Sequence, residues 1–213
     1  MAEVFQKGTL YLCATPIGNL EDITYRTVRC LTEADIIAAE DTRHTRQLLS
    51  AYGIETPLTS YHEHNKGEKG PLLIERLQDG DMVAVVSDAG LPGICDPGSD
   101  LVREALAASI PVVPLPGANA GLTGLIASGL DTTLFTFVGF LPKTKRHRRP
   151  VLEGLKEYGG TLIFYEAPHR IEGVLAEIEE VLGDRPAVLC RELTKKYEEY
   201  IRGSLSCVRQ RLQ

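Results

Sequence analysis

Several signals of secretion and membrane insertion are missing from this 213-residue sequence. Residues 1–7 do not have the basic-then-apolar pattern of a signal peptide, and the most apolar stretch, 120–141, is interrupted by threonines and by Asp131. The five cysteines form an odd set without a C-x-x-C pair, so neither a disulfide framework nor a zinc site is indicated. These absences predict a cytoplasmic protein with reduced thiols.

The sequence also lacks the usual glycine motifs for nucleotides. No G-x-G occurs anywhere in the chain, and no glycine cluster matches G-x-x-x-x-G-K-[ST]. These absences disfavour a dinucleotide site, a phosphate-gripping ATPase and the commonest methyltransferase fold.

Negative charge prevails, since the net charge is −6, and this disfavours a surface that coats nucleic acid everywhere. One segment is the exception, and its cations are Lys143, Lys145, Arg146, Arg148 and Arg149. We interpret this basic run as a loop that either lies in solvent or contacts RNA phosphates.

Apolar stretches of strand length alternate with helical patterns in the first half of the chain. The stretches are 8–15, 36–39, 82–86 and 112–115. Asp22 or Thr24 can cap a first helix, and Asp41 or Thr42 can cap a second one that ends at Gly53. This alternation predicts an α/β domain over 1–118, with a mostly parallel sheet covered on both faces.

The composition changes near residue 119, which predicts a second α/β domain over 119–213 with a mixed sheet. Its expected strands are 135–140, 161–165 and 187–190, and its expected helices are 151–158, 169–183 and 205–212. The sequence stops in a helical pattern, so we expect a C-terminal truncation.

Three loops that follow predicted strands are candidate ligand sites, because ligands bind beyond the carboxyl ends of strands in α/β sheets. The loop 87–98 holds Asp88, which could accept a hydrogen bond from a ligand, and Asp96, which could simply cap the next helix. The loop 114–121 is rich in small residues, and the loop 165–170 contains His169 and Arg170.

Other polar residues are candidates for catalysis or metal binding. Glu40 and Asp41 follow a strand and could act as a base, a metal ligand or a helix cap. His62 and His64 would share one face of a strand, but no further ligand has supportive spacing, so no metal site is expected.

Taken together, these segments resemble the 16S ribosomal RNA (cytidine-2′-O)-methyltransferase family, a branch of the tetrapyrrole methylase superfamily. The matching blocks, in order along the chain, are 14–24, 39–45, 87–98, 114–117, 139–142, 165–170 and 191–195. Because they span nearly the whole chain, the resemblance is specific.

The resemblance implies a two-domain tetrapyrrole-methylase-like fold, a homodimer, no metal, and S-adenosylmethionine bound in the cleft between the domains. Carried over by position, the residues implied to bind the cofactor are Pro16, Ile17, Asp88, Leu91, Asn119, Ala120, Tyr165 and Glu166.

The implied reaction is methylation of a cytidine ribose in 16S rRNA, either free or within the small ribosomal subunit. A ribose hydroxyl needs a proton acceptor, and the candidates are Glu40, Asp41, His62 and Glu166. Arg43 and Arg170 join the basic run as predicted RNA contacts.

Three alternatives stay open. They are a methylase of the same fold acting on a tetrapyrrole or another small molecule, a Mg²⁺-dependent phosphohydrolase using the acidic loops, and a catalytically inactive RNA-binding module.

Overall fold

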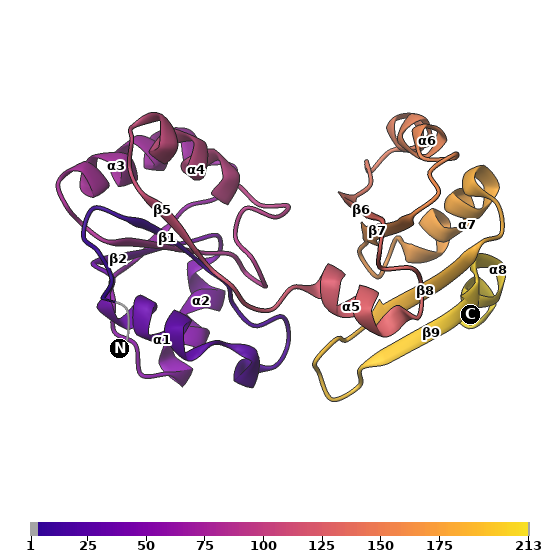
Figure 1. Cartoon of the computed structure of the whole chain (residues 1–213), viewed down its shortest axis with the longest axis horizontal. Coiled ribbons are helices and arrows are strands. Elements are labelled where there is room, and N and C mark those ends of the chain that lie inside the picture. Colours follow the sequence, from indigo (N-terminus) through magenta and orange to yellow (C-terminus); the bar gives the residue numbers. More distant parts are fainter. Residues whose placement is uncertain (1–3, 213) are drawn as a thin grey trace. The chain divides into compact units, whose positions relative to one another are not determined.

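The computed structural model describes residues 4–212 and divides the chain after Asn119 into two compact units. Both units combine helices and strands, so the α/β class is confirmed (Figure 1). Each unit is described by itself below.

A parallel five-stranded sheet forms the centre of the first unit. Its strands are β1 (Leu10–Cys13), β2 (Ile36–Ala39), β3 (Leu58–Ser60), β4 (Val83–Val86) and β5 (Val112–Leu115). They lie in the order β3-β2-β4-β1-β5, and every pairing is parallel. β2 and β4 are buried along their whole length because both faces of the sheet are covered.

Two pairs of helices cover this sheet. The first pair, α1 (Tyr25–Glu33) and α2 (Thr42–Ala51), packs on one face, and the second pair, α3 (Lys66–Gln78) and α4 (Gly98–Ala107), packs on the other (Figure 1). A short 3₁₀ helix, η1 (Leu20–Asp22), precedes α1. Each face therefore has its own apolar core, as the uniformly apolar strands predict.

Side-chain caps define where the helices on the first face begin. The Thr24 hydroxyl accepts a hydrogen bond from the Thr27 amide at the start of α1, and the Asp41 carboxylate accepts one from the Arg43 amide at the start of α2. Of the alternatives left open by the sequence, Thr24 and Asp41 are the caps.

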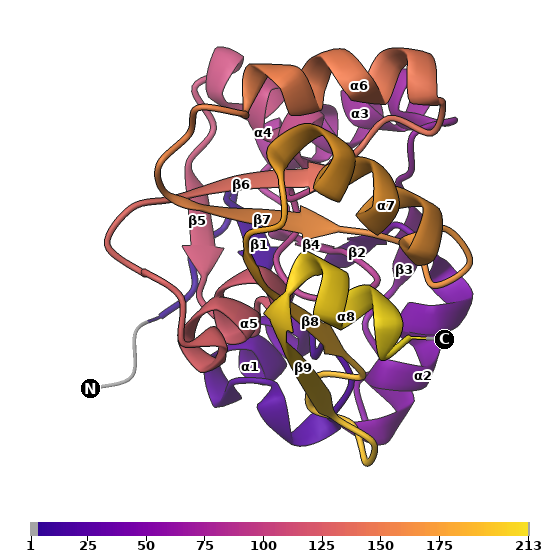
Figure 2. The same ribbon diagram turned by 90° about the vertical axis from the view of Figure 1, so that its right-hand side faces the viewer.

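The second unit is built from two small sheets and four helices. Its elements are α5 (Ala120–Ser128), β6 (Phe135–Phe140), α6 (Lys145–Gly154), β7 (Thr161–Tyr165), α7 (Ile171–Leu182), β8 (Pro186–Arg191), β9 (Glu199–Ser204) and α8 (Leu205–Gln210). β6 and β7 pair in parallel, whereas β8 and β9 pair antiparallel (Figure 2). The unit thus contains both kinds of pairing, in separate sheets. One apolar core, to which Leu152, Ile178 and Ile201 belong, joins α6, α7, α8 and β9.

The strand β6 is irregular near its end. Phe137 pairs with Ile163 and Gly139 pairs with Phe164, so Val138 is an extra residue in β6. Gly139 has φ of +72°, a conformation that glycine adopts without strain.

Three details of the sequence prediction are wrong. The short strand β3 and the strand β9 were missed, and α6 begins at Lys145, inside the segment that was expected to be a loop. The helix expected over 151–158 is α6, which ends at Gly154, and Pro150 lies inside it. Within residues 4–212, no helix combines the length and apolar character needed to cross a bilayer.

Candidate functional site

The topology of the first sheet marks one position for a ligand. β1 and β4 are neighbours, yet the chain leaving β1 runs toward β2 while the chain leaving β4 runs toward β5 on the other side. Ligands of open α/β sheets bind at such a switch point, beyond the carboxyl ends of the two strands. The loops at this point are 14–19 and 87–98.

These two loops are bonded to each other. The Thr15 amide donates to the Gly90 carbonyl at 2.9 Å, and the Gly90 amide donates to the Thr15 carbonyl at 3.1 Å. Gly90 has φ of +83°, and a Cβ there would lie 3.3 Å from the Ala118 oxygen and 3.4 Å from a methyl carbon of Ile17. A glycine is therefore required where the three loops after β1, β4 and β5 meet.

The loop after β5 approaches the loop after β1 even more closely. A Cβ added to Gly117 would lie 2.5 Å from the Cβ of Ala14. Pro16, Ile17 and Leu91 are half-buried around this junction. The junction gives a fixed, partly exposed backbone with polar groups, which suits a cofactor carrying sugar hydroxyls, an amine and a carboxylate.

Asp88 links two strand ends. Its Oδ1 accepts a hydrogen bond from the Asp41 amide at 3.1 Å, so it holds the end of β2 beside the loop after β4. The carboxylate is half-buried and retains acceptor capacity for a ligand. Asp88 therefore has a structural contact whether or not it also binds the cofactor.

Glu40 and Asp41 are adjacent in sequence but differ in acidity. Burial raises the pKa of Glu40, and the nearby charge of Asp88 adds to this effect. Hydrogen bonds from the Arg43 side chain and amide lower the pKa of Asp41 to about 2. Since a stronger acid is a weaker conjugate base, Glu40 is the better proton acceptor of the two.

His62 follows β3 and does not lie on a strand with His64, so the predicted shared strand face is wrong. Its amide donates to Asn65 Oδ1 at 2.8 Å, while the ring Nδ1 is buried without a hydrogen-bond partner in the described residues. Residues 4–212 contain no group of three or more His, Cys, Asp or Glu arranged to hold a metal ion.

A cavity of about 400 Å³ lies on the first unit, and Glu40, Gly93, Cys95 and Asp96 are among the residues that line it. Asp96 accepts hydrogen bonds from the amides of Gly93 at 2.8 Å and Gly98 at 2.7 Å. Asp96 thus shapes the loop 87–98 before α4, as the simpler interpretation of the sequence suggested. Burial raises the pKa of Asp96 as well, but the Asp96 carboxylate is engaged by these amides, so Glu40 is the better candidate for acid–base chemistry in this cavity.

In the second unit, the predicted residues after β7 are held by their neighbours. The Tyr165 hydroxyl accepts from the Gly121 amide at 2.9 Å, next to Ala120 at the start of α5. Glu166 is nearly buried and lies 3.3 Å from the Arg170 guanidinium. This pairing leaves Glu166 less available as a base than Glu40.

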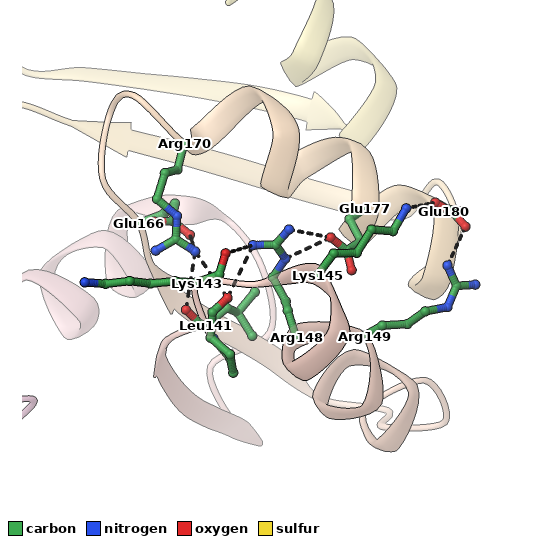
Figure 3. Close-up of polar contacts among 10 residues, drawn as sticks. Leu141, Lys143, Lys145, Arg148, Arg149, Glu166, Arg170, Glu177 and Glu180 are labelled. Carbon is green, nitrogen blue, oxygen red and sulfur yellow. Dashed lines mark hydrogen bonds and ion pairs between the residues drawn. The ribbon is translucent and has the colours of Figure 1, made fainter.

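The basic run does not behave as one solvated loop (Figure 3). Arg148 is buried, with 8% of its surface exposed, and its Nε and Nη2 donate to Glu177 Oε2 at 2.9 and 2.6 Å. Arg149 pairs with Glu153 and Glu180. Arg148 was therefore wrong as an RNA contact, because its guanidinium holds α6 against α7.

Most of the other predicted RNA contacts are exposed, and Arg170 is the exception. Lys143, Lys145 and Arg146 are exposed, and Lys145 lies 3.6 Å from Glu180. Arg43 is exposed and paired with Asp41 at 2.9 Å. Arg170 is mostly buried and donates to the carbonyl oxygens of Leu141 and Pro142.

Sequence reasoning missed Glu177, which is 4% exposed and forms the buried half of the pair with Arg148. The available signal was a charged residue among Val174, Leu175 and Ile178 on the apolar face of a helix. A lone acid at such a position predicts a buried basic partner.

Comparison with known families defines the class of protein. Residues 9–208 match the family of tetrapyrrole (corrin/porphyrin) methylases. The chain therefore belongs to this family, and the switch-point loops described above lie within the matched region.

Two individual proteins are similar to nearly the whole chain. The chain is 57% identical over 199 residues to ribosomal RNA small subunit methyltransferase I of Halalkalibacterium halodurans, covering 93% of this chain and 69% of that protein. It is 55% identical to the protein of the same name from Bacillus subtilis, covering 93% of this chain and 68% of that one.

A solved structure has the same fold at low sequence identity. Uroporphyrin-III C-methyltransferase from Thermus thermophilus, complexed with S-adenosyl homocysteine, is 20% identical to this chain with a TM-score of 0.64. The match covers 96% of this chain and 92% of that one. This likeness supports the fold.

Proposed function

We propose that the chain is an S-adenosylmethionine-dependent methyltransferase that modifies the ribose 2′-hydroxyl of a cytidine in 16S rRNA. The observation that carries this proposal is the identity of 57% to a ribosomal RNA small subunit methyltransferase over 93% of the chain. The fold alone would not choose the substrate, because one fold serves many reactions.

The switch-point loops of the first unit fit the cofactor. Pro16 and Ile17 would supply apolar contacts, Leu91 would supply backbone groups, and the Asp88 carboxylate would accept from a hydroxyl or the amine. When bound, S-adenosylmethionine supplies a methyl group on a positively charged sulfur. The roles of Asn119, Ala120, Tyr165 and Glu166 in binding stay predictions from the resemblance.

The protein's own chemical task is to orient the ribose hydroxyl and accept its proton. Glu40 suits this task because its raised pKa makes it a stronger base than an ordinary carboxylate. Asp41, with a pKa of about 2, is better suited to capping α2.

A first test measures cofactor binding with S-adenosylhomocysteine. A ligand that binds only the folded protein stabilises it, by about 2.7 kcal/mol at a hundredfold excess over Kd, so the thermal midpoint should rise. Asp88→Ala should weaken binding, whereas Asp88→Asn keeps an acceptor for the Asp41 amide and removes the charge. If both variants bind like the parent, Asp88 is only a structural residue.

A second test identifies the acceptor atom. Replacing the target cytidine by deoxycytidine in an otherwise intact small-subunit substrate should abolish methyl transfer, while binding hardly changes because phosphate contacts dominate affinity. Glu40→Gln should lower the transfer rate without lowering affinity for S-adenosylhomocysteine. Methylation of the deoxy substrate would move the reaction from the ribose to the base.

We also propose that the protein acts as a homodimer in the cytoplasm, on rRNA within the small ribosomal subunit. Exposed apolar side chains on α5 and β6, including Ile126, Phe137 and Phe140, support a partner surface in the second unit. Light scattering should give twice the chain mass. Ile126→Glu should then shift the mass toward that of one chain.

A further inference from the structure

A second cavity, of about 430 Å³, lies where α6 and α7 begin in the second unit. We call it the α6–α7 pocket. Four cationic side chains and two carboxylates line it, together with His169. The cations are Lys143, Lys145, Arg148 and Arg170, and the carboxylates are Glu177 and Glu180. The pocket is thus locally positive in a chain whose net charge is −6.

The two arginines of the pocket are engaged with the protein itself. Arg148 Nη1 donates to the carbonyl oxygens of Pro142 and Lys143 at 3.3 and 3.4 Å. Arg170 Nη2 donates to those of Leu141 and Pro142 at 3.5 and 3.3 Å. Two guanidinium groups therefore fix the turn 141–143, as Figure 3 shows.

Two other groups of the pocket, Lys143 and His169, are free to meet a ligand. The Lys143 side chain is exposed, extends away from Arg148 and Glu177 in Figure 3, and has no ion pair within residues 4–212. His169 is exposed too, and its ring has no hydrogen bond there. Lys145 is only loosely held by Glu180, at 3.6 Å. A fixed turn thus presents exposed polar side chains that make few contacts with the fold.

Backbone groups add to the positive potential. The pocket is lined by the first turns of α6 and α7, and neither helix has a side-chain hydrogen bond at its N-cap. The unpaired amides of a helix N-terminus carry partial positive charge and favour anions.

We propose that the α6–α7 pocket binds a backbone phosphate of the RNA substrate. Lys143, Lys145 and His169 are the contacts, while Arg148 and Arg170 hold the turn that presents them. The identification of the anion as RNA rests on the proposed function, whereas the phosphate chemistry rests on the pocket alone.

The test compares Lys143→Ala with Lys156→Ala, which removes the same charge from an exposed position beyond the other end of α6. Binding of a single-stranded, cytidine-containing RNA is measured across a salt series. Lys143→Ala should lower affinity about tenfold for every sequence and reduce the slope of log K against log salt by about 0.7, the value for one phosphate contact on a single strand. Lys156→Ala should change neither quantity.

Inorganic phosphate, titrated at constant ionic strength, tests the pocket without RNA. It should shift the amide resonances of Gly173 and Val174 in the parent and in Lys156→Ala, but not in the double variant Lys143→Ala with His169→Ala. Unchanged thermal midpoints would show that these variants remain folded.

The outcomes separate the pocket from the proposed function. Equal RNA affinity and salt slope in Lys143→Ala and Lys156→Ala would overturn the proposal, even if the parent methylates rRNA. Phosphate shifts without any effect of Lys143→Ala on RNA binding would also overturn it, because the anion would not be RNA. If the parent methylates no rRNA but the phosphate shifts vanish in the double variant, the anion site stands and the proposed function fails.

Discussion

The two units of the chain bury different kinds of polar group. The buried polar residues of the first unit are hydroxyl-bearing, namely Thr9, Thr15, Thr27, Thr45 and Ser87. The second unit buries a full ion pair, Arg148 with Glu177. In the first unit, half-buried carboxylates such as Asp88 and Asp96 help to position the loops after the strands, whereas in the second unit a fully buried ion pair helps to hold the turn 141–143. The second unit should therefore respond far more strongly to the loss of one charge.

The largest expected effect comes from breaking this pair. Glu177→Ala leaves the Arg148 guanidinium buried without its partner, and such a change costs about 3–5 kcal/mol. The free energy of unfolding from urea titration, followed by circular dichroism, measures the loss.

The control removes both charges. The double variant Arg148→Met with Glu177→Leu should recover most of the loss, because an apolar pair of similar volume replaces the ion pair. A double variant as unstable as Glu177→Ala would mean that the hydrogen bonds from Arg148 to the turn 141–143 matter more than the buried charge.

In the first unit, the matching vulnerability is close packing. Gly117→Ala places a methyl group 2.5 Å from the Cβ of Ala14, and overpacking of this kind costs about 1–3 kcal/mol. S-adenosylhomocysteine should also bind more weakly, since the loops after β1 and β5 must separate. The double variant with Ala14→Gly should restore both quantities; if it does not, the contact is not the cause.

A smaller effect, which stabilises the protein, is expected from glycine replacements in both units. Gly67 in α3 and Gly154 in α6 have open space where a Cβ would go and no positive φ. Gly67→Ala and Gly154→Ala should each stabilise the protein by about 0.4–1 kcal/mol, because alanine loses less backbone entropy on folding. A destabilising result in only one unit would show that its helix end is strained.

The smallest expected effects are on the pH dependence of stability, and they have opposite signs at the neighbouring residues Glu40 and Asp41. Folding raises the pKa of Glu40. Its contribution to the free energy of unfolding is therefore most favourable at low pH and is lost as pH rises through the folded pKa. Glu40→Gln should therefore raise the thermal midpoint at neutral pH. Folding lowers the pKa of Asp41 to about 2, so its contribution is present above the unfolded value, about 3.9, and is lost as pH falls toward 2.

Asp41→Asn is the matched control, because asparagine can still cap α2. It should lower the neutral midpoint slightly, because the contact of the charged carboxylate with Arg43 is lost, and weaken the dependence on pH between about 4 and 2. If Glu40→Gln and Asp41→Asn shift the midpoint in the same way at every pH, the two carboxyls do not differ as the structure indicates.

Sequence reasoning reached the parts of the fold that depend on local patterns. Apolar runs such as 82–86 predicted buried strands, and Thr24 and Asp41 were among the predicted caps. It missed β3, whose residues Leu58–Ser60 are half-buried and too few for a periodic signal. β9 was missed because Arg202 and Gly203 interrupt its alternation of apolar and polar residues. The strand is defined by its pairing with β8, which a local pattern does not reveal.

The candidate site was predictable to the level of loops. Position after a strand identified the loops of Asp88 and Glu40, but only the strand order shows that β1 and β4 flank the switch point. The roles of Arg148 and Glu177 depend on a contact across 29 residues of chain, which no local pattern contains. For this reason Arg148, which stabilises the fold, was included among the predicted RNA contacts.

The extra residue in β6 changes the parity of the strand. In a regular strand, Phe137 and Phe140 would face opposite sides, since they are an odd number of positions apart. With Val138 inserted, both rings meet Tyr165, with centroids 5.0 and 5.6 Å away. Deleting Val138 would remove the bulge and leave Phe137 and Phe140 two positions apart, so both rings would still face Tyr165. A residue inserted after Gly139 would, by contrast, shift the alternation and turn Phe140 away from Tyr165. The aromatic cluster of the second unit thus depends on a count of residues as much as on their identity.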